Sequence, residues 1–233
     1  MKKLVLLCTL ILIAGVCFAQ NGEAADDSPR PNFFNLEITV GVPIHWTNSP
    51  DGHDNYGGAF KDRTVTANTA FGVALLFNFG RKMGVTLDGD FFFGSDVMGA
   101  SNTSAYSNSL FGANLFLGPV FYLYNSTFLR IPLAIGGHLA YWNSSSFYPD
   151  NFVFSAAAEQ MVSVTDVQIG PGVSIGMQFH FNNNIYMFSR TNVAMPLYRW
   201  HTLNANNGAV SLGHAEFMLG WIVKPSLGLG IKF

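Results

Sequence analysis

The residues of this chain that could do chemistry are a few charged side chains set among bulky apolar ones. Charged residues make up 11% of the 233 residues, against roughly 25% in an ordinary soluble domain. Seven of them share the polar positions of segments in which polar and apolar residues alternate: Glu37, Asp88, Asp90, Arg130, Arg190, Glu216 and Lys224. An unpaired buried charge is costly, so we expect opposite charges that share an interior to form a network of ion pairs.

Two interpretations of this network are open. It is either a static polar plug, which fills an interior just wide enough for side chains, or a rearrangeable gate in a narrow pore. Counted from the short-turn ends of their segments, Glu37 and Lys232 lie at similar depth. Closure of the sheet would make their strands neighbours, so an ion pair between these two residues is also expected.

Other candidate chemistry is weaker. Ser211, His214 and Glu216 lie close together near the end of one segment, but no nucleophile motif accompanies them, and we expect no enzyme activity. His53 and Asp54 are two potential metal ligands, and two ligands do not make a site. We therefore expect neither a metal nor another cofactor. The net charge of −2 and the lack of a basic patch argue against nucleic acid as a partner.

The N-terminus has the pattern of a secretory signal peptide. Lys2 and Lys3 precede an apolar stretch over 4–16 that is too short to span a membrane, and Cys17 and Ala19 offer small residues at the −3 and −1 positions. Cleavage after Ala19 is expected. The rival interpretation is a lipoprotein signal with the lipid on Cys17. The expected division is a signal peptide over 1–19, a disordered periplasmic leader over 20–32 and a barrel over 33–233.

The cysteine positions support export without disulfides. Cys8 and Cys17 both lie in the expected signal peptide, so the mature chain keeps no thiol. No run of 18 or more apolar residues occurs in the chain, which argues against a membrane-spanning helix.

The elements that must position the charges are segments of two-residue alternation. From Asn35 to Trp46 every even residue is large and apolar, and every odd residue is polar, small or proline. This alternation predicts a strand with one apolar and one polar face. The same pattern recurs over 65–79, 84–94, 108–123, 128–142, 165–181, 185–198 and 213–233, which makes eight strands.

The connections alternate between short and long. The short ones are 80–83, 124–127 and 182–184, and the long ones are 47–64, 95–107, 143–164 and 199–212. Residues 154–161 of the longest connection include three alanines, and we expect a short helix there. Short turns at one end and long loops at the other are typical of outer-membrane barrels.

Aromatic residues gather towards both ends of the expected strands. Trp46, Trp142, Trp200 and Trp221 lie near the long-loop ends, although Trp142 and Trp200 fall on the polar side of their strands. Near the other end lie Phe77, Phe79, Phe121, Tyr124, Phe128, Phe179, Phe181, Tyr186 and Phe233. Two aromatic girdles, one at each membrane interface, are therefore expected.

These patterns predict an all-β fold, a closed antiparallel eight-stranded transmembrane β-barrel in the cell outer membrane. Its periplasmic turns would be short, its extracellular loops long, and its apolar side chains would face outer-membrane lipid. The alternative is a soluble lipocalin-type barrel with its apolar face inward. The second face here is rich in Gly, Ser, Thr and Asn, which is too weakly charged for a soluble exterior.

The last residues carry a resemblance to known families. Pro225 to Phe233 alternate apolar and small residues and end in an aromatic residue. This segment resembles the closing strand of OmpW-like and OmpA-transmembrane-domain-like outer-membrane barrels. The resemblance implies that Phe233 is an assembly signal, read by the barrel-assembly machinery after delivery by periplasmic chaperones.

Two functions follow as expectations. The first is a narrow channel for small or apolar solutes, the latter as in OmpW-like proteins. The second is a surface adhesin or ligand-binding protein that contacts a host or environmental ligand through its extracellular loops.

Overall fold

The computed structural model describes residues 33–48, 63–97, 108–148, 160–205, 210–217 and 219–233. They form a single 11-stranded antiparallel sheet and include no helix long and apolar enough to cross a membrane. The strands are β1 Phe34–Gly41, β2 Ile44–Asn48, β3 Arg63–Asn78, β4 Met83–Val97, β5 Asn108–Asn125, β6 Leu129–Tyr148, β7 Gln160–His180, β8 Ile185–Ala194, β9 Tyr198–Ala205, β10 Val210–Phe217 and β11 Leu219–Lys232.

Three pairs of these strands are pieces of single barrel strands, so the barrel has eight. β1 continues into β2 past Pro43, and β8 continues into β9 past Pro196. Proline has no backbone N–H to donate, so it interrupts the ladder at these points. β10 and β11 flank residue 218, which lies outside the description.

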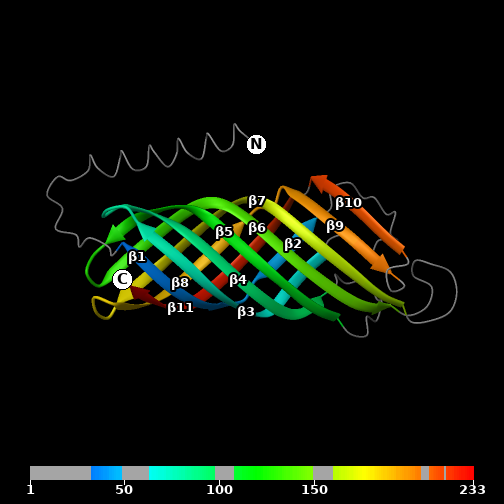
Figure 1. The fold of residues 1–233 in the computed structure, drawn as a ribbon, viewed down its shortest axis with the longest axis horizontal. Helices are drawn as coiled ribbons and strands as arrows, with labels where there is room; N and C mark the ends of the chain where they lie inside the picture. Colours follow the sequence, from blue (N-terminus) through cyan, green and yellow to red (C-terminus); the bar gives the residue numbers. More distant parts are fainter. Residues whose placement is uncertain (1–32, 49–62, 98–107, 149–159, 206–209, 218) are drawn as a thin grey trace.

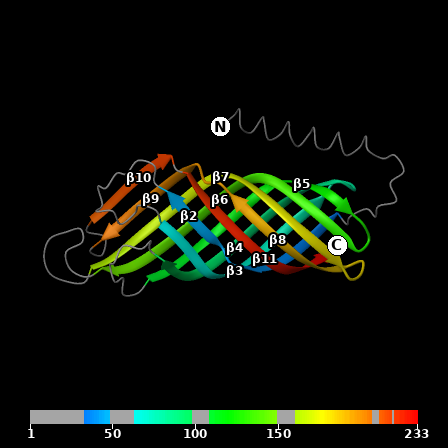
Figure 2. The same cartoon turned by 180° about the vertical axis from the view of Figure 1, so that it is seen from behind.

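The sheet closes on itself. Each barrel strand pairs with the next one along the chain, and the last pairs with the first through β1–β11 and β2–β11. Figures 1 and 2 show the tilted strands wrapping around a common axis. The prediction of a closed antiparallel eight-stranded barrel is confirmed.

The two ends of the barrel differ. The tight turns lie at one end, together with the start of β1 and the C-terminus (Figure 1), where the Phe233 N–H donates to the Phe34 carbonyl at 2.9 Å. The strands reach unequally towards the other end, since β6 and β7 have 20 and 21 residues while β4 has 15. We call the two ends the tight-turn end and the long-loop end.

The predicted loops 143–164 and 199–212 are too long. β6 continues to Tyr148, β7 already begins at Gln160, and β9 and β10 occupy 198–205 and 210–217. Apolar alternation fades in these extensions, but the backbone ladder does not depend on it. The helix expected over 154–161 is wrong at Gln160 and Met161, which belong to β7, and its other residues lie outside the description.

The predicted faces are confirmed for the described side chains, apart from Trp200 of β9, which faces outward against its predicted parity. In β1, Asn35, Glu37 and Thr39 are buried inside, while Ile38 and Val40 are exposed on the outside. Because successive strand residues point to opposite faces, the outer surface becomes an apolar belt. The belt includes Phe71, Val73, Leu117, Ile135, Ile175 and Leu227, all at least 42% exposed.

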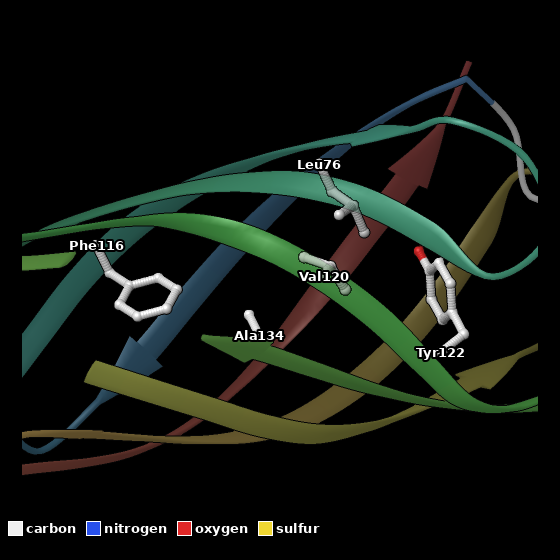
Figure 3. Packing of buried hydrophobic residues seen from close by; sticks show 5 residues of the cluster. All are labelled: Leu76, Phe116, Val120, Tyr122 and Ala134. Atoms are coloured by element: carbon white, nitrogen blue, oxygen red, sulfur yellow. The ribbon is translucent and has the colours of Figure 1, made fainter. Parts of the chain in front are cut away.

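Apolar side chains share the lumen with the polar ones. Figure 3 shows one cluster, in which Leu76 of β3, Phe116, Val120 and Tyr122 of β5 and Ala134 of β6 turn into the barrel. Each is at most 8% exposed. At this level the described side chains pack against one another inside the lumen.

Two lumen-facing glycines make room for aromatic rings. A Cβ at Gly112 would lie 2.3 Å from the ring of Phe92, and one at Gly230 would lie 2.1 Å from the ring of Tyr186. Both distances are far inside van der Waals contact, so these rings can cross the lumen only where the opposing residue has no side chain.

An aromatic girdle at the tight-turn end is present. The ring of Phe34 lies 5.3 Å from that of Phe77 and 5.6 Å from that of Phe233, and Phe128 and Phe179 are 6.0 Å apart. Such spacings are favourable for aromatic pairs. Tyr186 was wrongly assigned to this girdle, because its side chain is fully buried inside the barrel.

Near the long-loop end, Trp200 and Trp221 face outward and Trp142 faces inward. Trp200 and Trp221 are 48% and 45% exposed, whereas Trp142 is fully buried. Trp142 is therefore a lumen residue, as its parity indicates. The side chain of Trp46 lies outside the description.

Candidate functional site

Five charged side chains from four strands meet in the middle of the lumen. They are Glu37 of β1, Asp88 and Asp90 of β4, Arg190 of β8 and Lys224 of β11. Arg190 Nη1 lies 2.8 Å from Glu37 Oε2, and Arg190 Nη2 lies 3.6 Å from Asp88 Oδ2. Lys224 Nζ lies 3.6 Å from the same Asp88 oxygen and forms a closer ion pair with Asp90. We call this chain of pairs the central network.

Neutral donors fix the two carboxylates of β4. Asn192 Nδ2 donates to Asp88 Oδ2 at 2.8 Å, and Asn114 Nδ2 donates to Asp90 Oδ1 at 3.0 Å. Hydrogen bonds to a charged acceptor are stronger than neutral ones. They hold each carboxylate where a cation can reach it.

Glu37 is held in the same way at its other oxygen. Tyr186 Oη donates to Glu37 Oε1 at 2.8 Å, and Gln178 Nε2 donates to it at 3.0 Å. The guanidinium of Arg190 also lies over the ring of Phe188, 5.0 Å from its centroid. The buried Tyr186, together with Gln178, thus orients Glu37 towards Arg190.

The central network nearly fills its part of the lumen. A cavity of about 10 Å³ remains, lined by Asp88, Asp90, Asn114, Phe116, His138, Asn192, Val193, Ala194, Ile222 and Lys224. That volume holds about one water molecule. This cavity is therefore too small for a solute larger than water.

A second ion pair lies in the lumen nearer the long-loop end. Arg199 Nε of β9 pairs with Asp166 Oδ2 of β7, and both side chains are almost fully buried. The sequence missed Arg199, because it was assigned to the loop 199–212. The only sequence signal was Pro196, a proline within an otherwise alternating segment.

A β-bulge at Pro196 turns Arg199 into the lumen. Ala194 pairs with Gly172 and Tyr198 with Ile169, so three residues on one strand face two on the other. One extra residue reverses which side chains point inward. This reversal also explains why Trp200 faces outward, although its parity with β8 predicted the lumen.

The remaining predicted site residues lie elsewhere. Arg130 is buried in the lumen but belongs to neither ion-pair group. Lys232 Nζ donates to the Asn182 carbonyl at 3.2 Å. The expected Glu37–Lys232 ion pair is therefore wrong, because Glu37 pairs with Arg190.

The side chains of several other predicted site residues lie outside the described part of the chain. Glu216 lies on β10, opposite Arg199 in the ladder, but its side chain is outside the description, as are those of Ser211 and His214. His53 and Asp54 are also outside it. Phe233 is described, and its side chain is 65% exposed on the outer face.

Comparisons with known proteins bear on the fold alone. Neither protein-family models nor curated proteins give a match. Among solved structures, the outer membrane protein OprG of Pseudomonas aeruginosa is 12% identical with a TM-score of 0.52, over 87% of this chain and 97% of that one. The outer membrane protease OmpT of Escherichia coli is 10% identical with a TM-score of 0.48, over 91% and 99%. Ail of Yersinia pestis is 13% identical with a TM-score of 0.41, over 87% and 99%. The chain has the fold of the small outer-membrane barrels.

Proposed function

We propose that this closed eight-stranded barrel resides in the cell outer membrane and acts as a narrow channel whose gate is the central network. Residues 1–19 would direct export as a signal peptide and would be removed by cleavage after Ala19. The outward apolar belt supports the membrane location, because a belt of this kind is stable against lipid tails. Phe233, exposed at the tight-turn end, would be presented to periplasmic chaperones and to the barrel-assembly machinery.

One observation supports the gate: Asp88 is shared by two cations. Both Arg190 and Lys224 lie 3.6 Å from its Oδ2 atom, while each has a closer carboxylate, Glu37 or Asp90. Each cation therefore has two carboxylates within reach. Exchange between them moves a side chain without leaving a charge unpaired, which avoids most of the cost of breaking a buried pair.

The size and polarity of the lumen support small polar solutes. The residual cavity of about 10 Å³ holds about one water molecule, so passage requires the network to rearrange. Charged groups line the central level, and transfer of an apolar solute past them would gain little. We therefore favour water, ions and small polar solutes over the apolar solutes of the sequence-based expectation.

Single-channel recording in a planar bilayer tests the gate. We expect low conductance from the wild-type barrel and a higher open probability from Arg190→Ala, which removes both the Glu37 and the Asp88 link. A loss of about 1.4 kcal/mol acting on the closed state alone would raise the open probability about tenfold. Arg81→Ala, in an exposed turn, is the matched control and should behave as the wild type.

One result of the recordings would contradict the gate. Negligible and equal currents from wild type and Arg190→Ala, with both proteins folded, would identify the network as a static plug. The channel proposal would then fail.

A second candidate function is favoured by the long-loop end. The β6–β7 ladder continues beyond the level of Trp142 to the pair Tyr148–Gln160, and β5 and β9 accompany it for most of this extension. A wall that extends further on one side of the barrel suits a surface adhesin or ligand-binding protein. Deletion of 149–159 should then abolish attachment of barrel-bearing cells to a host surface and leave conductance unchanged. Attachment that survives the deletion would remove this alternative.

A further inference from the structure

The buried charges of the lumen do not balance at every level. The described and buried charged side chains are the carboxylates Glu37, Asp88, Asp90 and Asp166 and the cations Arg130, Arg190, Arg199, Lys224 and Lys232. The central network takes three of the carboxylates, and Arg199 takes Asp166. Among these groups, Arg130 and Lys232 are left without a carboxylate.

These two cations lie at the same end of the barrel. Arg130 is the second residue of β6, and Lys232 is the last residue of β11. His180, the last residue of β7, donates its backbone N–H to the Phe128 carbonyl at 2.8 Å, which places it beside the start of β6. Arg130 lies opposite Gln178 in the ladder, two residues before His180. Lys232 Nζ donates to the carbonyl of Asn182, two residues after His180, at 3.2 Å. We call these three residues the basic cluster.

Several hydrogen-bond donors of the basic cluster have no acceptor among the described residues. Arg130 is only 3% exposed, yet its Nε and Nη1 atoms have no acceptor among the described residues. Both ring nitrogens of the buried His180 are also without a partner there. A buried guanidinium without hydrogen-bond acceptors or a counter-charge is strongly unfavourable. The arrangement is therefore incomplete as a purely structural element and complementary to an anion.

We propose that the basic cluster is a binding site for an oxyanion, a phosphate or carboxylate group, at the tight-turn end of the lumen. The planar guanidinium of Arg130 matches the two oxygens of such a group, and Lys232 adds a point charge. His180 adds a ring N–H. This site is separate from the central network, and it stands whether or not the barrel conducts.

Two sources could supply the oxyanion. One is free phosphate, which enters from the tight-turn side. The other is the chain itself, because residues 20–32 include Glu23, Asp26 and Asp27 and join the barrel just before β1. β1 also pairs with the end of β11, where Asn35 lies opposite Lys232.

Calorimetric titration of inorganic phosphate tests the site, with the full mature barrel in nanodiscs of zwitterionic lipid. We expect saturable binding that Arg130→Met weakens at least about tenfold, since a charge-assisted hydrogen-bond pair is lost. Arg130→Lys should retain part of the affinity. Lys82→Gln, which removes an exposed turn cation at the same end of the barrel, should bind as the wild type. If Arg130→Met does not fold, Lys232→Gln gives the same comparison.

Neutralising the leader separates the two sources. In E23Q/D26N/D27N, tighter phosphate binding than in the wild type assigns the site to the leader carboxylates, and unchanged binding assigns it to free anions. Absence of binding in both the wild type and the leader variant would overturn the proposal. Equal affinities for wild type, Arg130→Met and Lys232→Gln would also overturn it, because phosphate would then bind elsewhere.

Discussion

The role of each charged residue in this barrel depends on the partners that surround it. Asp88 and Asp166 are both buried carboxylates on the lumen side, yet Asp88 is within reach of two cations and Asp166 pairs with Arg199. A carboxylate that two cations share, such as Asp88, can exchange one cationic partner for the other. The Asp166–Arg199 pair, sealed near the long-loop end, is better suited to stability than to gating.

The Asp166–Arg199 pair yields a prediction about stability. Asp166→Asn removes a carboxylate that pairs with the buried guanidinium of Arg199, and it should reduce the free energy of unfolding by about 3–5 kcal/mol. Urea-induced unfolding in lipid vesicles measures this quantity. The double variant Asp166→Leu/Arg199→Met removes both charges and should recover most of the loss, because apolar replacements of similar volume often substitute well for a buried pair. A single variant as stable as the wild type would contradict a structural role.

At the scale of the strand, one bulge determines what the long-loop half of the barrel presents inside. The three residues 195–197 lie opposite two residues of β7, and Arg199 turns inward as a result. The bulged backbone also comes very close to its neighbour. A Cβ at Gly170 would lie 2.1 Å from the Met195 carbonyl oxygen and 2.8 Å from Pro196 Cα.

This close approach predicts that Gly170→Ala is destabilising. The added methyl group would meet backbone atoms that have no rotamer to change, so we expect a cost of about 1–3 kcal/mol. Gly137→Ala is the matched control, since a Cβ there has nothing within 4 Å and points outward. Unfolding midpoints in lipid vesicles should separate the two variants. Equal midpoints would mean that the bulge can yield, and that it does not fix the direction of Arg199.

At the scale of the whole molecule, the residues on the outer surface determine which medium surrounds the barrel. Large apolar side chains are exposed along the barrel strands, for example Leu117 and Leu123 on β5, while the charged strand residues whose side chains are described lie inside. This inversion of the usual soluble arrangement favours lipid as the surrounding medium.

The membrane setting predicts a dependence on depth along β5. Leu117→Arg, far from the strand end, should destabilise the barrel in vesicles by about 2–4 kcal/mol, because it places a charge among lipid tails. Leu123→Arg, two residues before the end of β5, should cost about 0–1 kcal/mol. Both leucines are outward and similarly exposed, at 53% and 60%. Equal costs for the two variants, or high solubility of the folded wild type without detergent, would contradict the membrane setting.

The sequence by itself determined the strands and their faces. Two-residue alternation is a local property, and it identified all eight barrel strands and the inward direction of Glu37, Asp88, Asp90, Arg190 and Lys224. It also placed Arg130 and Lys232 inside. Within a strand that no bulge interrupts, side-chain direction depends only on parity, so these residues needed no tertiary information.

The tertiary structure alone decided the partners. Glu37 pairs with Arg190 and not with Lys232, because contacts across a lumen depend on the stagger of all the strands together. Arg199 enters the lumen and Trp200 turns outward through a bulge, against the parity of β8. Register, bulges and closure are properties of the whole sheet, so parity could say which charges enter the lumen but not which of them meet.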